Sequence, residues 1–406
     1  MPASDPATPV TMDIKDRIAV VTIDSPPVNA LGHAVRSGVM ASLDKAEADG
    51  AIDAVVIRGG GRCFSGGADI REFGTPPAEP TLRQLCARVE EFPKIVVAAL
   101  HATAFGGGLE LPLSCHYRIA DATAQIALPE VKLGIVPGSG GTQRLPRIIG
   151  AKRALKVILS GDPFSAQEAR DLGVLDAIVD GDLTDAAVAY AKKLVSEGAP
   201  LRKVRDLAVA DADAEVFAEA RKTWEKRSRG LLAPLACIDC VEIAATKPFD
   251  EGMEREREIF VACRDSEQSK AQRHLFFAER EAAKVKDVPR DTQKRPINTA
   301  AVVGCGTMGG GIAMCLANVG IPVTVLETTE DALAAGMAKI EKNYAATVSK
   351  GRLSQDAMNT RMGLISGTTN YADLGPADIV IEAVFEEMEL KKTIFGELDK
   401  VMKPGA

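Results

Sequence analysis

The sequence predicts an α/β protein: a layered α/β domain, then a helical region, then a second and smaller α/β unit. Short apolar runs alternate with longer amphipathic segments over the first part of the chain, which is typical of β-α-β units with parallel strands. A new pattern of strand, glycine loop and helix begins after Pro296. A chain of 406 residues has room for two or three domains. We therefore expect one domain at 10–285 and another at 296–406.

The first domain is expected to follow a disordered tail, MPASDPATPVTMD, and to begin with a strand at 17–24, RIAVVTID. A helix at 37–50 comes next, because apolar residues recur on one of its faces, at Val39, Met40, Leu43 and Ala46. Short apolar runs bounded by turn residues predict further strands, at 54–58, 94–100, 119–120 and 126–127.

The pattern becomes helical from about Asp185 to Val285. The run 254–285 is rich in Glu, Arg, Lys, Ala and Phe and contains neither Gly nor Pro, so it predicts long surface helices that close off the first domain. The segment 286–295, KDVPRDTQKR, is charged, contains a proline and has no apolar period. It is the predicted linker.

Composition narrows the classes of partner. A net charge of −7 with a pI near 5.4 gives no electrostatic footprint for nucleic acid or for an anionic membrane. We expect no membrane span, because no apolar run approaches the roughly 20 residues of a transmembrane helix, and no secretory signal. Of eight scattered cysteines only Cys237 and Cys240 form a C-x-x-C pair, and no His cluster accompanies it. We expect a cytoplasmic protein with reduced thiols and no metal.

Two glutamates in apolar surroundings are the candidate catalytic residues. Glu110 follows the glycine triplet 106–108, and Glu130 follows a proline in LPEVKLG. A carboxylate among apolar residues is costly unless it is paired, hydrogen-bonded or used. The glycines allow the backbone to approach a ligand and to point amide groups at it. This pattern predicts a pair of acid/base groups that face one site.

A second glycine turn, GGGRCFSGGADI at 59–70, follows a buried strand. Asp69 is placed to cap a helix that we expect to follow it. The amide of Ala68 would then lie at a helix N-terminus, where the helix dipole favours negative charge. Together with the amide of Gly107 it can form a two-donor hole for an oxygen that gains charge during a reaction.

The C-terminal part carries a dinucleotide-binding pattern. A strand at 300–303 leads into Gly304-x-Gly306-x-x-Gly309 and an apolar helix, and a second strand at 321–326 ends at Glu327. With both strands, the helix and the acidic residue in place, the pattern indicates a βαβ unit that binds a dinucleotide through its pyrophosphate. Glu327 would bind the ribose hydroxyls and repel a 2′-phosphate, which favours NAD over NADP.

The motifs SPPVNALG, GRCFSGGADI, AFGGGLELPLSCHYRIA and LPEVKLGIVPGSGGTQRLPR resemble the crotonase, or enoyl-CoA hydratase/isomerase, superfamily over about the first 285 residues. The resemblance implies a spiral β-β-α fold that binds acyl-CoA, with the amides of Ala68 and Gly107 as the oxyanion hole. It also implies that Glu110 and Glu130 hold one water and move a proton at the α-carbon, as in a hydratase. The resemblance further implies a capability for Δ3–Δ2 isomerisation, which would be carried mainly by Glu130.

The segment ADIVIEAVFEEMELKKTIFGELDKV resembles the 3-hydroxyacyl-CoA dehydrogenase family. This resemblance implies that Ala383, Glu386 and Lys391 lie along the nicotinamide half of the cofactor. No histidine follows Gly304, so the family's catalytic base is absent from this sequence. We therefore expect an incomplete Rossmann domain, with the dehydrogenase step of the multifunctional β-oxidation enzymes lost in this chain.

Three alternatives stay open at this point: a crotonase-fold acyl-CoA hydrolase or decarboxylase, a working dehydrogenase, and a non-catalytic module that binds CoA and NAD. Self-association and contact with a thiolase also stay open.

Overall fold

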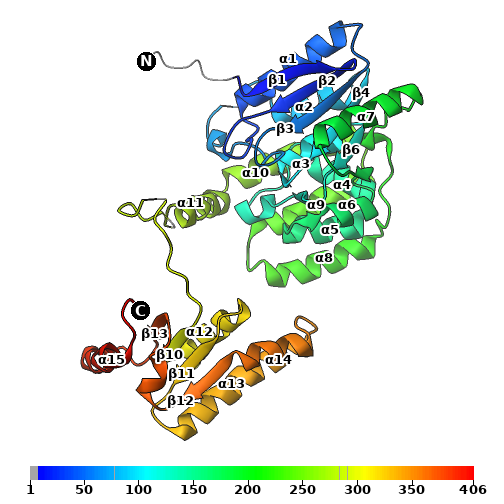
Figure 1. Cartoon of the computed structure of the whole chain (residues 1–406). Coiled ribbons are helices and arrows are strands. Elements are labelled where there is room, and N and C mark those ends of the chain that lie inside the picture. The colour runs from blue at the N-terminus through cyan, green and yellow to red at the C-terminus, as the bar shows by residue number, and fades with distance from the viewer. Residues whose placement is uncertain (1–7, 77, 283, 290) are drawn as a thin grey trace. The chain divides into compact units, whose positions relative to one another are not determined.

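The computed structural model describes residues 8–76, 78–282, 284–289 and 291–406. The chain divides into two compact units, with the boundary between Val285 and Lys286 (Figure 1). Each unit has its own parallel sheet and its own buried apolar clusters, and each is described by itself.

The main sheet of the first unit has the strand order β1-β2-β3-β4-β6-β9. Neighbouring strands are parallel except for β1, which is antiparallel to β2. Parallel strands that are buried on both faces consist of near-continuous apolar residues, as β2 (IAVVTI) and β4 (IVVAAL) do. The bounds are β1 Val10–Lys15, β2 Ile18–Ile23, β3 Ala54–Gly59, β4 Ile95–Leu100, β6 Tyr117–Ala120 and β9 Ala177–Ile178.

Strand β1 corrects the expectation of a disordered tail up to residue 13, which is wrong from Val10 onward. Residues 1–7 of that tail lie outside the described residues. Val10 and Met12 pack against the main core, whereas Thr11 and Asp13 between them do not belong to it. This alternation suits an edge strand with one buried face. Its antiparallel pairing runs from Val10 opposite Ile23 to the tight turn at residues 16 and 17.

Helices cover both faces of the main sheet. Ala19 and Val21 of β2 belong to the apolar cluster that contains α1, whereas Ile18 and Val20 belong to the cluster that contains α7. The helix expected at 37–50 is α1, which begins earlier, at His33. The bounds of these helices are α1 His33–Ala48, α2 Leu82–Glu90 and α7 Leu183–Ser196.

The strands of a smaller sheet, β5-β7-β8, precede segments that carry the candidate site residues. Its strand β5 ends just before α3, and β7 ends just before the 3-10 helix η2. A glycine turn then leads into α4. The N-termini of α3, η2 and α4 therefore lie within 107–141 of the sequence. The bounds are β5 Thr103–Phe105, α3 Gly107–Ser114, β7 Gln125–Ala127, η2 Glu130–Leu133, α4 Gly141–Ile149 and β8 Phe164–Ser165.

The run 254–285 was expected to form surface helices, which is wrong for α10, because one of its faces is buried. Cys237, Ile238 and Val241 of α9 are fully buried in the main cluster. Helix α10 buries one face, with Glu256 at its centre and Phe260 one turn further on. The bounds are α5 Ala151–Ser160, α6 Ala166–Asp171, η3 Val204–Asp206, α8 Ala214–Arg227, α9 Leu232–Thr246, α10 Phe249–Asp265 and α11 Glu267–Ala282.

The second unit is a parallel sheet of order β12-β11-β10-β13. One apolar cluster packs α12, α13 and α14 against the sheet, and another packs α15 and η4 against it. Strand order therefore reverses between β10 and β13, which is the position where open α/β sheets bind ligands. The bounds are β10 Ala300–Val303, α12 Thr307–Asn318, β11 Val323–Leu326, α13 Glu330–Val348, α14 Gln355–Gly363, β12 Ile365–Thr368, η4 Tyr371–Leu374, β13 Ile379–Glu382 and α15 Met388–Val401.

The expected linker, 286–295, contains neither helix nor strand in its described residues, and Arg290 lies outside them. Among the described helices, none combines the length and the apolar character needed to cross a bilayer.

Candidate functional site

A cleft of about 720 Å³ in the first unit contains all four residues predicted for the first site. Glu110 and Glu130 line it together with Ala68 and Gly107. Its remaining lining comes from the loop 66–76, from α2, from the segment 135–139 and from α10. The cleft is mostly apolar, with a few convergent polar groups, which is the usual composition of a small-molecule site.

Glu110 lies in the first turn of α3 and is almost fully buried. Its Oε1 accepts hydrogen bonds from the amides of Ser139 at 2.7 Å and Gly141 at 2.9 Å. Burial raises the pKa of Glu110, and the two amides and the nearby Arg144 guanidinium oppose that rise. The amides thus stabilise the ionised form of this carboxyl group.

Glu130 begins η2 and has an exposed fraction of 9%. Its Oε2 is buried and has no hydrogen-bond partner among the described residues. Burial, and then repulsion from Glu110, raise the pKa of Glu130 well above its ordinary value. Gly106 makes room for this side chain, because a Cβ atom there would lie 2.7 Å from Glu130 Oε1.

The amides of Ala68 and Gly107 lie next to each other, since a Cβ atom on Gly107 would be 3.1 Å from the Ala68 nitrogen. Within the described part of the chain, neither amide donates to an acceptor. The expected helix after Asp69 is only the three-residue 3-10 helix η1, Ile70–Glu72, which Asp69 caps through the Arg71 amide. The helix dipole at this site therefore belongs to α3, which Gly107 begins.

A third buried carboxylate, which the sequence analysis missed, reaches the same region from α10. Glu256 is 0% exposed, and its Oε1 accepts from the Gly140 amide at 2.7 Å. Its Oε2 accepts from the Thr142 amide at 3.2 Å and contacts the Thr142 hydroxyl. Burial and then the Glu110 carboxylate raise the pKa of Glu256 to about 8. The signal was its spacing from the apolar residues Met253 and Phe260, three before and four after it.

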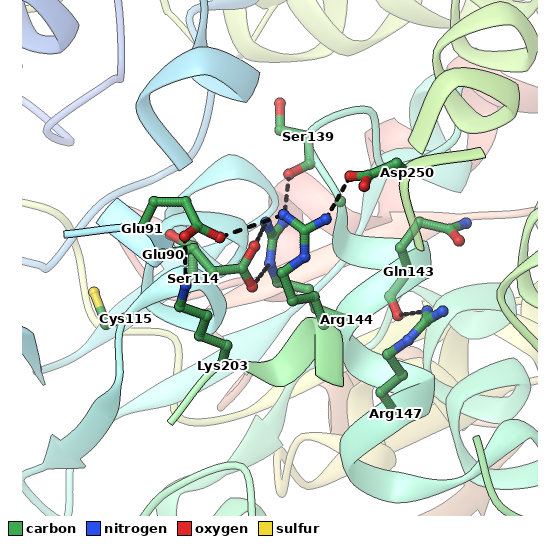
Figure 2. Close-up of polar contacts among 12 residues, drawn as sticks. Glu90, Glu91, Ser114, Cys115, Ser139, Gln143, Arg144, Arg147, Lys203 and Asp250 are labelled. Atoms are coloured by element: carbon green, nitrogen blue, oxygen red, sulfur yellow. Dashed lines mark hydrogen bonds and ion pairs between the residues drawn. The ribbon is translucent and has the colours of Figure 1, made fainter. Parts of the chain in front are cut away.

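An ion pair stands behind the turn 139–142. The Arg144 guanidinium binds the Glu90 carboxylate at 2.8 and 3.0 Å and donates to the Ser139 carbonyl at 3.2 Å (Figure 2). The two side chains are 1% and 2% exposed. Glu90 neutralises most of the charge of Arg144. The guanidinium therefore offsets the negative charges of Glu110 and Glu256 only in part.

Arginines line another part of the cleft, where α2 and α10 contribute Arg83, Arg257 and Arg264. Arg83 pairs with Glu254, and Arg264 pairs with Asp265 at 2.7 Å. Arg257 has no ion-pair partner among the described residues and lies over the Phe260 ring, 5.5 Å from its centroid. Burial and then the charges of Arg264 and Arg83 lower the pKa of Arg257.

His101 and His116 lie near Glu110 in the sequence, but neither of them lines the cleft. His116 is buried, accepts from the Val96 amide at 3.0 Å, and has a pKa lowered by burial to about 4. Cys237 and Cys240 are buried free thiols on α9. No group of three or more His, Cys, Asp or Glu in the described ranges is arranged to hold a metal.

In the second unit, the glycine loop follows β10 and opens α12, with Gly306 at its N-cap. Gly309 lies against the start of the loop, because a Cβ atom there would be 1.8 Å from the Gly304 carbonyl oxygen. Glu327 follows β11, and its Oε1 accepts from the Cys305 amide at 2.7 Å. The expected acidic residue therefore lies beside the glycine loop.

The residues expected near the nicotinamide follow β13, in the loop after it and in α15. Ala383 follows β13, and a Cβ atom on Gly304 would be 2.9 Å from its carbonyl oxygen. Lys391 of α15 binds Glu386 at 2.9 Å and Glu382 at 3.3 Å. Ala383 thus lies just beyond the carboxyl end of β13, and Lys391 pairs with Glu382, the last residue of that strand.

Comparison with known proteins gives two family matches. Residues 13–229 match the family described as enoyl-CoA hydratase/isomerase, and residues 299–406 match the NAD-binding domain of 3-hydroxyacyl-CoA dehydrogenase. A crystal structure of carnitinyl-CoA hydratase from Mycobacterium avium has a TM-score of 0.51 and 30% identity, over 68% of this chain and 97% of that one. The predicted crotonase-type fold is thus confirmed.

The chain is also similar to part of several longer proteins that are named as bifunctional or multifunctional enzymes. It is 41% identical over 402 residues to a peroxisomal bifunctional enzyme of Danio rerio, covering 96% of this chain and 54% of the relative. It is 38% identical over 403 residues to the human protein of that name, covering 97% and 55%. A peroxisomal fatty acid β-oxidation multifunctional protein of Arabidopsis thaliana is 35% identical over 413 residues, covering 97% and 57%.

The chain therefore spans about half the length of these curated relatives. The matched families and the fold of both units lead to one conclusion. The chain belongs to the enoyl-CoA hydratase/isomerase family, and it joins such a domain to the NAD-binding domain of 3-hydroxyacyl-CoA dehydrogenase.

Proposed function

We propose that residues 10–285 form a domain that hydrates 2-trans-enoyl-CoA to 3-hydroxyacyl-CoA in fatty-acid β-oxidation. The observation that carries this proposal is the unequal environment of two carboxyl groups in one cleft: two amides hold Glu110, whereas Glu130 Oε2 has no partner among the described residues. Environments that push two pKa values apart assign one group as base and the other as acid.

In the proposed reaction the amides of Ala68 and Gly107 donate to the thioester oxygen. Glu110, as the carboxylate, takes a proton from water, and the water oxygen forms a bond to the β-carbon. The π electrons of the double bond then move toward the thioester, whose oxygen gains charge between the two amides. Glu130 gives its proton to the α-carbon and completes the 3-hydroxyacyl-CoA. The net change adds one water, and the proton returns from Glu110 to Glu130 through exchange.

The same groups support Δ3–Δ2 isomerisation as a second activity. Glu130, when ionised, would remove a proton from the α-carbon of a 3-enoyl thioester and return it at the γ-carbon. This needs one shuttling carboxyl group and the same oxyanion donors, and no water is added. Glu130 is suited to it because no hydrogen bond fixes its Oε2 among the residues that the structure describes.

Arg83, Arg257 and Arg264 are proposed to attract the anionic acyl-CoA into the cleft. Guanidinium groups bind phosphate and carboxylate oxygens in bidentate geometry. Arg257 supports this role because it lacks an ion-pair partner in the described ranges.

We propose that residues 296–406 form a second domain that binds NAD through Gly304, Gly306, Gly309 and Glu327, with Ala383, Glu386 and Lys391 beside the nicotinamide. The oxidation of 3-hydroxyacyl-CoA is not proposed for these 406 residues, because none of the four histidines follows Gly304. The relatives are named as peroxisomal proteins, so we favour a peroxisomal setting over the cytoplasmic one that composition suggested.

One assay separates this proposal from its rivals: the chain is mixed with crotonyl-CoA, with and without NAD. Loss of the enoyl-thioester absorbance, with 3-hydroxybutyryl-CoA as product, is expected in both cases, and NADH formation in neither. An acyl-CoA hydrolase would release free CoA, which a thiol reagent detects. A binding module would leave the absorbance unchanged, and that result would refute the proposed function.

A further inference from the structure

The backbone amides of the turn 139–142 donate hydrogen bonds alternately to two carboxyl groups, Glu110 and Glu256, which come from different helices. The first and third amides of the turn 139–142 donate to Glu110, from α3. The second and fourth donate to Glu256, from α10. The turn includes the N-cap Gly140 and the first two residues of α4, and the N-terminus of a helix favours negative charge. Glu110 therefore keeps its position only while the turn keeps its shape, and Glu256 holds half of the turn's amides.

We propose that Glu256 is a positioning residue of the hydratase site: it holds the turn that orients Glu110, and its charge helps to keep Glu130 protonated. This inference rests on the proposed function. It assigns a role to α10, which contributes no residue to the pair of catalytic carboxyl groups.

The groups that face Glu256 support the second half of this role. The Glu110 carboxylate raises the pKa of Glu256, and the Glu256 carboxylate in turn raises the pKa of Glu130. From α4 comes the Arg144 guanidinium, which Glu90 of α2 neutralises.

Two buried thiols of α9, Cys237 and Cys240, also face Glu256. Burial raises their pKa values, so these groups stay neutral. Repulsion among the three carboxyl groups is therefore only partly offset by a cation.

The pKa of Glu256, about 8, gives this repulsion a consequence for the reaction. Burial and repulsion from neighbouring carboxylates raise the pKa of Glu130 well above its ordinary value, and Glu256 contributes to that repulsion. A new charge on Glu256 makes the loss of the Glu130 proton harder. The pH above which the hydration rate falls should therefore be higher than the pH that burial of Glu130 and repulsion from Glu110 alone would give.

Glu256→Gln separates charge from shape. The amide oxygen can still accept from Gly140, and the amide nitrogen can donate to the Thr142 hydroxyl, so the turn keeps two of its contacts. Glu256→Ala removes all of them. Thr142→Val is a second test of similar volume, because it removes the hydroxyl that contacts Glu256. The matched control is Glu258→Gln, an exposed glutamate on the same helix that pairs with Arg255.

The experiment measures kcat and KM of the full chain for crotonyl-CoA hydration from acid to alkaline pH. For Glu256→Gln, the alkaline limb of kcat/KM should move down by about one pH unit, which is a roughly tenfold change in proton affinity. Thr142→Val should move it in the same direction by less. Glu256→Ala should also lower kcat by at least about tenfold, with KM changed by less than about threefold. Glu258→Gln should match the wild type.

A purely structural Glu256 would lower stability or kcat without moving the alkaline limb. If Glu256→Gln and Thr142→Val fold, as circular dichroism reports, and both give the wild-type pH profile, the inference is overturned while the hydratase assignment stands. A wild-type chain that does not hydrate crotonyl-CoA refutes the proposed function instead.

Discussion

The Glu110 and Glu130 carboxyl groups line the same cleft but receive unequal hydrogen bonding. Glu110 Oε1 accepts from two amides, at 2.7 and 2.9 Å, whereas Glu130 Oε2 is buried without a partner among the described residues. Two identical side chains are thereby given different proton affinities by their surroundings. The turn 139–142 creates this difference, so the chemistry of the cleft depends on a segment that supplies only backbone groups to Glu110.

The first prediction concerns the group that carries the proton. Glu130→Gln should lower kcat for crotonyl-CoA hydration by about 10²–10⁴-fold, because a positioned acid or base contributes that much. KM should change by less than about threefold, since the amides of Ala68 and Gly107 are untouched. Steady-state kinetics measures both values. Glu197→Gln, at an exposed site after α7, is the control, and full activity of Glu130→Gln would remove Glu130 from the mechanism.

The second prediction concerns stability and pH. Glu256 has a pKa of about 8 when folded and an ordinary value of 4.5, so between these values the folded chain binds a proton that the unfolded chain has lost. Stability from this group is therefore full below pH 4.5 and is lost as the pH rises toward 8. His116, lowered from 6.5 to about 4, has the opposite effect, but only below pH 6.5. Between pH 6.5 and 8 the His116 effect has ended, and the raised pKa values of Glu256 and Glu130 both lower stability as the pH rises.

In that window the free energy of unfolding of the first unit should fall by about 1.4 kcal/mol per pH unit from Glu256. Urea unfolding at several pH values measures it, and fluorescence of Trp224, the one tryptophan of the chain, reports on the first unit. Glu256→Gln should have a flatter profile. A wild-type stability that rises from pH 6.5 to 8 would show that Glu256 is ionised in the folded chain.

The sequence predicted the elements whose residues follow one clear pattern. Strands β2, β3 and β4 are continuous apolar runs because both of their faces are buried. Strand β1 was missed because VTMDIK buries one face only and so has no apolar run. Strand β1 is joined to its antiparallel partner β2 by a tight turn. Whether such a segment forms a strand is decided by tertiary packing.

The candidate site was predicted where its motifs are local, at Glu110, Glu130 and the glycine turns. Glu256 was missed because its neighbours, EREREI, read as a solvated helix face. Only the three-dimensional contact of α10 with the turn 139–142 buries this carboxyl group. The spacing of Met253 and Phe260 indicates a buried face of α10, but no local pattern identifies the turn as its partner, since the two segments are more than a hundred residues apart.

The third prediction concerns the ion pair behind the turn. Glu90→Gln leaves the Arg144 guanidinium buried without its counter-charge, which should destabilise the first unit by about 3–5 kcal/mol. Urea unfolding followed by Trp224 fluorescence measures the loss. The double variant Glu90→Leu, Arg144→Met should recover much of it, because an apolar pair of similar volume has no charge to desolvate. Equal stability of Glu90→Gln and wild type would mean that Glu90 does not neutralise Arg144.

The fourth prediction concerns the second unit and its preference between NAD and NADP. Glu327 lies beside the glycine loop, where its carboxylate can accept from ribose hydroxyls and repel a 2′-phosphate. Glu327→Gln should therefore weaken NAD binding by about tenfold, the equivalent of about 1.4 kcal/mol, and should weaken NADP binding less or improve it.

Calorimetric titration of the full chain with each dinucleotide measures both affinities, so the ratio of the two Kd values is the deciding quantity. Glu341→Gln is the matched control, because that residue is exposed on α13. If Glu327→Gln lowers both affinities equally, the carboxylate acts only on the loop through the Cys305 amide, and cofactor selection must come from another residue.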